Sequence, residues 1–547
     1  MMLLPPAAAA PVPSNFEPAS YTARGAYHVH TNRSDGTGTL DEIAAAAAAA
    51  GLDFVIVTDH GDGTRALEPP VYRAGVLCLD GVEISTQYGH YVALGMSAAP
   101  YPLAGHPSDV IEDVHRLGGF GFVAHPGSPK PALRWTSDAR FDGIEWLNAD
   151  SEWRDEFFHS LGRVLLTYAF RPTESLASLL DRPDEVIQRW DGAAASRRVP
   201  AIAGTDAHAR LGVGQGGDPY EGRVVARIPS YEVSFSVFSN HVLIDRPLTG
   251  AAKEDAATLL YAIREGRIFT SVDGLAHLSR FEVAASSGSL FARQGEYLDL
   301  DGTAVIDARA AAPPGTRLVL RRDGHVLHEV ASDRLRIDVG AQPGAYRIEA
   351  YLPSALRGSS SVPWILANPI YIGMRSLHQR DSHATLPPAT DRMSLSTGWQ
   401  TEASVGSESS LAQGALTDGS PALEWRFKLS DGARRQQFAA MRFTLDPALR
   451  TRDRLQLRVT SDRPRRLWAQ LRAPGGRDGE RWGKTFYADE TLRMIELRFA
   501  DFQPLGLVSS ERPDVGRVDS LLLVIDTLNS RPGAAGVLEI ADVSLAR

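Results

Sequence analysis

Residues 26–36 read Ala-Tyr-His-Val-His-Thr-Asn-Arg-Ser-Asp-Gly, and this stretch decides the fold of the first part of the chain. Its beginning predicts a strand over 26–30, in which alternation places His28 and His30 on one side. Two imidazoles on one side of a strand can bind one metal ion, and Asp35 follows five residues later as a possible carboxylate ligand. The stretch therefore predicts a metal site where a first strand ends.

Short apolar runs alternate with helical stretches from Tyr21 to about Thr205. Thr39 and Glu42 have the spacing of a capping box and predict the start of a first helix. Further strands are expected over 54–57, 76–84, 91–94, 120–124, 143–147 and 199–203, and further helices over 108–117, 152–168 and 174–195. Such alternation is typical of a largely parallel α/β sheet or barrel.

Metal-ligand residue types recur where these strands end: His60 after Asp59, then Glu83, His125, and Asp206 with His208. The carboxyl ends of parallel strands meet on one face, so residues far apart in sequence can share a pocket there. A single histidine or aspartate is more often a hydrogen-bonded structural residue. The repeated position favours metal binding, and imidazole with carboxylate suits zinc, manganese or iron.

These motifs, in this order, resemble the PHP (polymerase and histidinol phosphatase) superfamily over about residues 21–210. The motifs that carry the resemblance are 28–30 with 34–36, 58–60, Glu83, 125–127 and 204–208. The resemblance implies a distorted (β/α)7 barrel that holds two or three divalent metal ions. It also implies hydrolysis of phosphate esters by a metal-activated water, with no serine or cysteine nucleophile.

The resemblance also implies which residues hold the metals and take part in catalysis. His28, His30, Glu83 and Asp206 would bind one ion, Glu83 would bridge to a second ion that is also bound by His125, and Asp35, His60 and His208 would bind a third. Many members of the superfamily have one more histidine, near the position that is Trp153 here. His90 is expected either to replace this ligand or to have a structural role.

Three basic residues adjoin these motifs and are candidates for binding a phosphate group: Arg33, Lys130 and Arg210. The alternative for each is an ordinary solvated surface charge. A small-molecule phosphoester or a related compound is the expected substrate.

Two further stretches resemble the carbaryl-hydrolase (CehA/McbA) branch of the superfamily and proteins with an appended β domain: Glu145-Trp146-Leu147-Asn148 and residues 363–371. A carbamate, ester or amide hydrolase is therefore an alternative. A glycan-binding protein with a non-catalytic barrel is a third hypothesis. The polymerase-associated branch is disfavoured, because no polymerase-sized region or basic surface accompanies the domain.

The chain divides into a leader over 1–20, a metallohydrolase domain over 21–274, a β-sandwich over 275–375, a linker over 376–396, and a jelly-roll-like sandwich over 397–547 that resembles galactose-binding domains. Short strands separated by Gly, Pro and Asp predict the sandwiches. The last domain contains aromatic residues that either stack on sugar rings or pack in the core, namely Trp399, Trp425, Trp468, Trp482 and Tyr487. Carbohydrate is thus a possible partner of this domain.

The composition excludes several classes of protein. The 547 residues carry a net charge of −9, which gives no basic surface for nucleic acid. The single cysteine, Cys78, lies in an apolar run and is expected to be a buried thiol. No apolar stretch is long enough to span a membrane. Appended sandwiches favour a periplasmic or extracellular location over the cytoplasm, although residues 1–13 make a poor signal peptide.

Overall fold

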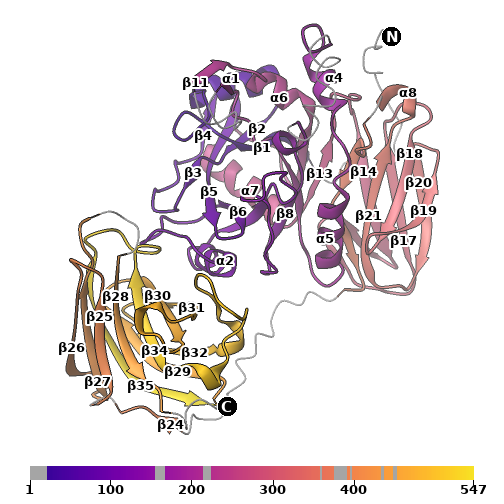
Figure 1. Ribbon diagram of the computed structural model, residues 1–547. Coiled ribbons are helices and arrows are strands. Elements are labelled where there is room, and N and C mark those ends of the chain that lie inside the picture. Colours follow the sequence, from indigo (N-terminus) through magenta and orange to yellow (C-terminus); the bar gives the residue numbers. More distant parts are fainter. Residues whose placement is uncertain are drawn as a thin grey trace. The chain divides into compact units, whose positions relative to one another are not determined.

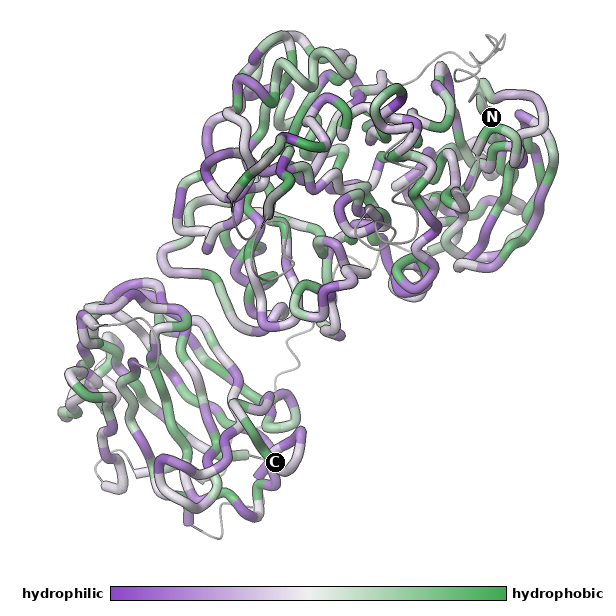
Figure 2. The backbone as a smooth tube through the Cα atoms, turned by 45° about the horizontal axis from the view of Figure 1, so that its top comes forward, coloured by the Kyte–Doolittle hydropathy of each residue, from purple (hydrophilic) through white to green (hydrophobic). Residues whose placement is uncertain are grey.

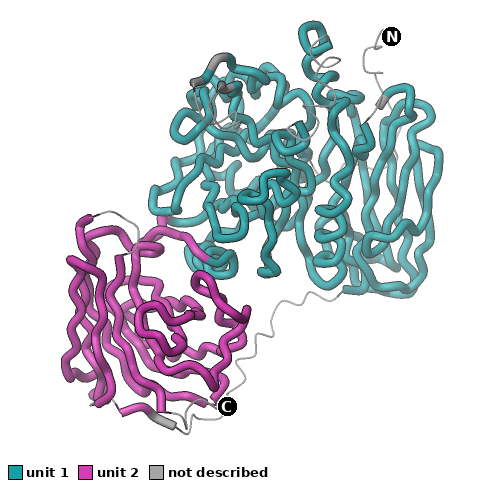
Figure 3. Tube along the Cα trace, viewed as in Figure 1, with its two compact units in different colours: residues 1–97, 106–380 teal, residues 98–105, 381–547 magenta. Residues whose placement is uncertain are grey.

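The structure is a computed structural model, and its chain forms two compact units (Figure 3). The first contains residues 1–97 and 106–380, and the second contains residues 98–105 and 381–547. The structure describes residues 21–153, 167–213, 223–357, 360–374, 391–394, 397–432, 437–446 and 452–546. The expected leader, most of the helix expected over 152–168 and most of the expected linker lie outside these residues.

Seven strands form the sheet of the first part of the first unit, and most of the residues predicted to bind metal lie in these strands or shortly after them. The seven strands are β1 (Tyr21–Val29), β2 (Phe54–Val57), β5 (Val76–Thr86), β6 (Gly89–Leu94), β7 (Phe120–Ala124), β8 (Gly143–Asn148) and β9 (Ala201–Gly204). Figure 1 shows β1, β2, β5, β6 and β8 among them. β1, β2 and β5 pair in parallel, and so do β7, β8 and β9, but β6 is antiparallel to both β5 and β7. The expected strands are confirmed, and the parallel run is interrupted at β6.

The segment that follows β9 returns to the first strand. Val29 and Ala207 form a parallel bridge, and the His30 amide donates to the Ala207 carbonyl at 3.0 Å. The Thr205 amide donates to the Tyr27 carbonyl at 2.9 Å. The ends of the first and last of the seven strands therefore lie side by side.

Four helices connect these strands among the described residues: α1 (Leu40–Ala49), α2 (Pro107–Arg116), α4 (Pro172–Ala177) and α5 (Asp184–Ala194). Two more follow β9: α6 (Tyr231–Val237) and α7 (Ala252–Arg264). The capping box of Thr39 and Glu42 is confirmed at the start of α1. The prediction of a single helix over 174–195 is wrong, because α4 and α5 are separate there. Arg182 precedes Pro183, and a residue before proline is disfavoured in a helix; Pro183 instead caps α5.

Shorter elements flank the seven strands: β3 (His60–Gly61), β4 (Val71–Arg73), β10 (Leu211–Val213), β11 (Arg223–Ala226), β12 (Ser239–Ile244) and β13 (Ile268–Ser271). β12 pairs with β1, and β13 pairs with both β12 and β22 (Ile365–Ala367). Hydrogen bonding thus continues from the seven strands into the β region that follows.

That β region contains two sheets (Figure 1). The first consists of β14 (Phe281–Ser287), β15 (Leu290–Arg293), β17 (Ala304–Ala310) and β20 (Arg334–Gly340). The second contains β16 (Tyr297–Leu298), β18 (Arg317–Arg322), β19 (His325–Val330), β21 (Gly344–Tyr351), β22 and β23 (Ile370–Ile372), and the short helix α8 (Ser354–Arg357) follows β21. The expected sandwich-like sheets are therefore present, and they are joined to the first part without a break in pairing.

Two asparagines occupy the edge of β9. The side chain of Asn368 accepts from the Ala201 amide at 2.7 Å and donates to its carbonyl at 2.8 Å. Asn240 makes the same pair of bonds with Ala203, at 3.0 and 2.8 Å. Both side chains are buried and satisfy backbone groups that would otherwise lack a partner. They hold the strand that leads directly to Asp206 and His208.

The second unit is a β-sandwich whose two sheets bury a common apolar core. One sheet contains β24 (Asp391–Arg392), β26 (Glu408–Ala415), β27 (Pro421–Lys428), β29 (Arg454–Ser461), β32 (Arg493–Arg498) and β35 (Ala535–Ala546). The other contains β25 (Trp399–Ala403), β28 (Phe438–Thr444), β30 (Arg465–Arg472), β31 (Arg481–Ala488), β33 (Gln503–Pro504) and β34 (Ser520–Asp526). Three single-turn helices, Gly476–Asp478, Phe499–Asp501 and Val515–Arg517, lie between strands.

Apolar and polar residues alternate along the strands of the second unit, as expected for sheets with one buried face (Figure 2). Trp425 and Trp482 belong to the core between the sheets, and Trp468 is only 8% exposed. Trp425 and Trp482 therefore pack between the sheets, whereas Trp468 is buried in a separate cluster with Leu522 and Val524. No helix among the described residues has the length and apolar character needed to cross a membrane.

Candidate metal centre

Glu83, at 1% exposure, is the middle of a buried cluster at the strand ends of the first unit. Imidazole nitrogens lie 2.6–3.2 Å from its two carboxylate oxygens. They belong to His28, His30, His60, His90 and His125. The cluster therefore brings together residues from β1, β3, β5, β6 and the end of β7.

Two more carboxylates extend the cluster. Asp206 Oδ1 lies 3.4 Å from His28 Nε2 and 3.2 Å from His30 Nε2. Asp35 Oδ2 lies 3.2 Å from His208 Nε2 and 3.5 Å from His60 Nε2. Three sets of ligand atoms are close enough to hold a metal ion: those of His30, Asp35, His60 and His208, those of His28, His30 and Asp206, and those of His60, Glu83 and His90.

The backbone is strained at three of these residues. His28, His125 and Asp206 have φ angles of 63°, 30° and 47°, in the left-handed region that side-chain-bearing residues rarely adopt. At His28 the pairing of β1 with β2 shifts register, so a bulge turns this side chain into the cluster. Strained backbone of this kind concentrates at functional sites, where the surrounding structure maintains it.

The donor set fits divalent metal ions. Nε2 of His30 is buried and lies 3.2 Å from a carboxylate oxygen of Glu83 and 3.2 Å from one of Asp206, without hydrogen-bond geometry to either, which is an arrangement that ligands around one metal ion can adopt. Nδ1 of His208 donates to the Asp206 carbonyl at 2.8 Å, and this bond turns Nε2 towards Asp35, 3.2 Å away.

The electrostatics of the cluster agree with this fit. Burial raises the pKa of Glu83, but the neighbouring His28 and His60 outweigh burial and hold the pKa well below its usual value. Burial lowers the pKa of His30, but Asp206 and Glu83 raise it to about 10. Ionised carboxylates in this cavity thus require compensating positive charge, which protons on the imidazoles or bound cations can supply.

Glu145 forms hydrogen bonds with two of the candidate ligands, His28 and His125. Its Oε1 accepts from Nδ1 of His28 at 2.5 Å, and its Oε2 accepts from the His125 amide at 2.6 Å. Asn148 donates to Glu145 Oε2 at 2.9 Å and to Asp206 Oδ2 at 3.4 Å. In the sequence, Glu145 and Asn148 indicate only a resemblance to one branch of the PHP superfamily. Their position where β8 ends, like that of the other ligands at strand ends, could have indicated this role.

The three basic residues predicted to bind substrate lie in different surroundings. Arg33 forms ion pairs with Asp59 at 2.9 Å and with Asp80 at 2.8 Å, and Asp59 also binds Thr31 and Ser34 of the same loop. Arg33 therefore fixes the loop between His30 and Asp35.

The other two basic residues also lie beside the cluster in sequence. Arg210 Nη1 donates to the Asp35 carbonyl at 3.3 Å. The Lys130 amide donates to Ser128 Oγ at 3.3 Å, in the loop that follows His125. Trp153, where a further histidine was expected, is partly buried.

A cavity of about 220 Å³ adjoins the cluster. His125, Glu145 and Asn148 form one part of its lining, and residues 181–186 form another. Arg182 anchors this second part, since its guanidinium donates to Glu349 at 3.3 Å and to the Tyr351 hydroxyl at 3.2 Å. The β region therefore positions a wall of the space beside the candidate ligands.

No protein-family model matches the chain, and no curated protein matches it. Among solved structures, it is similar to a two-domain protein from Bacteroides vulgatus that contains a predicted PHP-like metal-dependent phosphoesterase. The two are 12% identical with a TM-score of 0.27, and the match covers 65% of this chain and 95% of that chain. It is also similar to the family 11 carbohydrate-binding module from Clostridium thermocellum in complex with a mixed-linked tetrasaccharide, with 14% identity, a TM-score of 0.24, and coverage of 28% and 94%. A family 11 module of the cellulase Lic26A-Cel5E from Clostridium thermocellum gives 15% identity, a TM-score of 0.24, and coverage of 29% and 93%. At these values the similarities do not show a family.

Proposed function

We propose that the chain is a metal-dependent phosphoesterase of the PHP type. The arrangement of buried imidazoles around the Glu83 carboxylate is the observation that supports this function. We further propose that β1, β2 and β5–β9 form a distorted (β/α)7 barrel within a domain over 21–274, followed by a sandwich over 275–375. The return of the chain from Ala207 to Val29 supports a closed barrel.

The proposed metal ligands divide into three sets that share residues. His28, His30, Glu83 and Asp206 hold one ion, and Glu83 with His125 and His90 holds a second. Asp35, His60 and His208 hold the third. His90 enters the second set because its Nδ1 lies 2.6 Å from Glu83 Oε1. When bound, divalent zinc, manganese or iron ions activate water for attack and neutralise charge on the ester oxygens.

The chain's own residues prepare the site for this chemistry. Glu145 holds His28 with its Nε2 directed at Glu83 and Asp206, which lowers the cost of ordering the ligands. Arg33 and Asp59 fix the loop that carries Asp35. The cavity beside His125 provides room for the ester, and Arg210 and Lys130 are the proposed contacts for its phosphate.

The decisive experiment compares metal content and hydrolysis in the wild type and in a His28→Ala, His30→Ala double variant. Elemental analysis should find two or three equivalents of metal in the wild type and a large loss in the variant. Turnover of p-nitrophenyl phosphate and bis-p-nitrophenyl phosphate should fall with it and should be abolished by a chelator.

A His325→Ala, His328→Ala double variant is the matched control, because both histidines are exposed on β19. It should keep its metal and its turnover. Turnover of a naphthyl carbamate or p-nitrophenyl acetate, without turnover of phosphate esters, would instead support the amide, ester or carbamate hydrolase. Wild-type protein that binds no metal after reconstitution would overturn the proposal.

A further inference from the structure

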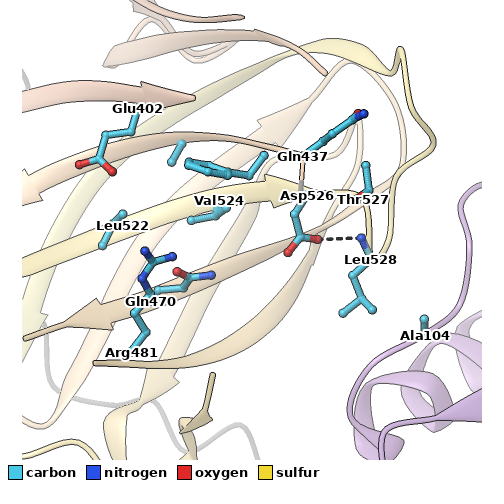
Figure 4. Close-up of a pocket in the computed structure, with 12 residues that line it drawn as sticks. Ala104, Glu402, Gln437, Gln470, Arg481, Leu522, Val524, Asp526, Thr527 and Leu528 are labelled. Carbon is cyan, nitrogen blue, oxygen red and sulfur yellow. Dashed lines mark hydrogen bonds between the residues drawn. The ribbon is translucent and has the colours of Figure 1, made fainter. Parts of the chain in front are cut away.

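The second unit has a cavity on the face of a sheet that does not belong to the core between its sheets (Figure 4). Along β34, Leu521, Leu523 and Ile525 point into the core, and the alternate residues point to the opposite face. Leu522, Val524 and Asp526 line a cavity of about 450 Å³ on that face. This volume is in the range of about 300–1,000 Å³ that is usual for small-molecule sites.

The floor of this cavity is apolar although it lies outside the core between the sheets. Ala440, Trp468, Leu522 and Val524 form a separate buried cluster, and Phe438 packs against it. Such a surface suits the C–H groups of a ring-shaped ligand, since burying apolar area contributes about 25 cal/mol per Å².

Two polar side chains with hydrogen-bonding capacity left unused face the same cavity. Gln470 is 6% exposed, and its side-chain oxygen has no hydrogen-bond partner among the described residues. Arg481 donates to the Arg477 carbonyl but has no ion pair with a carboxylate in the described part of the chain. A buried amide oxygen without a partner costs free energy, which a ligand hydroxyl can recover by donating to it.

The charges around the cavity largely cancel. Glu402 is paired with Arg472 at 2.8 Å and with Arg442 at 2.9 Å. Burial raises the pKa of Asp526 to about 6, so its charge is reduced below neutral pH. The cavity therefore has no excess of positive or negative charge that would attract a strongly charged ligand. Hydroxyl groups, which both donate and accept, match the mixture of guanidinium, amide and carboxyl groups.

A second cavity of about 410 Å³ continues the first, because Gln470, Arg481 and Asp526 line both. These three residues thus lie in the middle of an extended depression. We propose that this depression binds a neutral oligosaccharide, with sugar hydroxyls bonded to Gln470, Arg481 and Asp526 and a ring packed over Leu522 and Val524. The site is separate from the metal centre and does not depend on the phosphoesterase proposal.

Calorimetric titration of the full chain tests the proposal with cellotetraose, mannotetraose and xylotetraose as neutral probes and tetragalacturonate as the acidic probe. At least one neutral tetrasaccharide should bind, and Gln470→Leu and Arg481→Met should each weaken binding about tenfold or more, as expected for a lost hydrogen bond of about 1.4 kcal/mol. Arg463→Met is the matched control, because this arginine is exposed and does not line the cavity.

The His28→Ala, His30→Ala variant separates this site from the metal centre, since it should bind the sugar as the wild type does. Absence of binding by every neutral probe at millimolar concentration would overturn the proposal. Binding of tetragalacturonate alone, or neutral-sugar binding that both cavity variants leave unchanged, would also overturn it. Circular dichroism of each variant checks that the unit is folded.

Discussion

Glu145 Oε1 lies 2.5 Å from Nδ1 of His28, and both residues are fully buried. The bond fixes the His28 proton on Nδ1 and directs Nε2 towards Glu83 and Asp206. His28 also has a positive φ angle, a strained backbone conformation that the surrounding structure must maintain. We therefore infer that Glu145 is a positioning residue for the proposed metal centre and not one of its proposed ligands.

Glu145→Gln should weaken metal binding about 10–100-fold, as is typical when the partner of a metal-binding histidine is changed. Competition with a chelator of known affinity measures this change. Glu112→Gln, on the exposed face of α2, should have no effect. Equal metal affinity in Glu145→Gln and wild type would show that the bond to His28 does not position a ligand.

His90→Gln tests the second set of ligands. If His90 replaces the expected histidine near Trp153, this variant should lose about one metal equivalent and retain the ions held by His28 and Asp35. Its Nδ1 lies 2.6 Å from Glu83 Oε1 and its Nε2 lies 3.3 Å from Ser85 Oγ, and the amide group of a glutamine can still donate a hydrogen bond to Glu83. Unchanged stoichiometry, measured by elemental analysis, would assign His90 a structural role.

Local sequence signals predicted much of the first unit. Thr39 and Glu42 marked the start of α1, and the apolar runs marked β2 and β7, because these signals depend on residues close in sequence. Glu83 and Asp206 are far apart along the chain, but both follow predicted strands. Because the carboxyl ends of parallel strands meet on one face, the sequence predicts that they share one site. The structure places their carboxylates around the same histidines.

Other features depend on contacts that sequence patterns do not encode. The hydrogen bonds from Asn368 to Ala201 join residues 167 positions apart, so the local sequence around either residue does not predict them. The break between α4 and α5 had a local signal in Arg182-Pro183, which the helical pattern of the flanking residues obscured. Trp425 and Trp482 were compatible with both core and surface, and only packing between two sheets placed them in the core.

Asn368→Leu should destabilise the first unit by about 2–3 kcal/mol, because it leaves a buried amide and carbonyl of Ala201 without partners, at about 1 kcal/mol or more each. Asn240→Leu should have a similar effect at Ala203. Gln413→Leu, at an exposed position of β26, is the control. Urea unfolding followed by hydrogen exchange in β9 measures the change. A difference below about 0.5 kcal/mol would contradict the inference that the two asparagines hold β9 in place.

Asp526→Asn should stabilise the second unit in a pH-dependent way. Burial raises the pKa of this carboxyl to about 6 in the folded chain, above its ordinary value of 3.8. The folded state therefore holds more protons than the unfolded state between these values, and stability falls as the pH rises through them. Above about pH 7 the wild type bears the cost of a charged, partly buried carboxylate, and below about pH 4 it bears none.

Because Asp526 is partly exposed and accepts from the Leu528 amide at 3.0 Å, we expect a gain on the order of 1–2 kcal/mol for the variant at about pH 7.5 and almost none at about pH 4. Urea unfolding followed by hydrogen exchange in β34 measures both values. Asp501→Asn makes the same change at an exposed position and should show no difference between the two pH values. A gain in Asp526→Asn that is equal at both would mean that its cause is not the ionisation of the carboxyl, because only the charged form is penalised by burial.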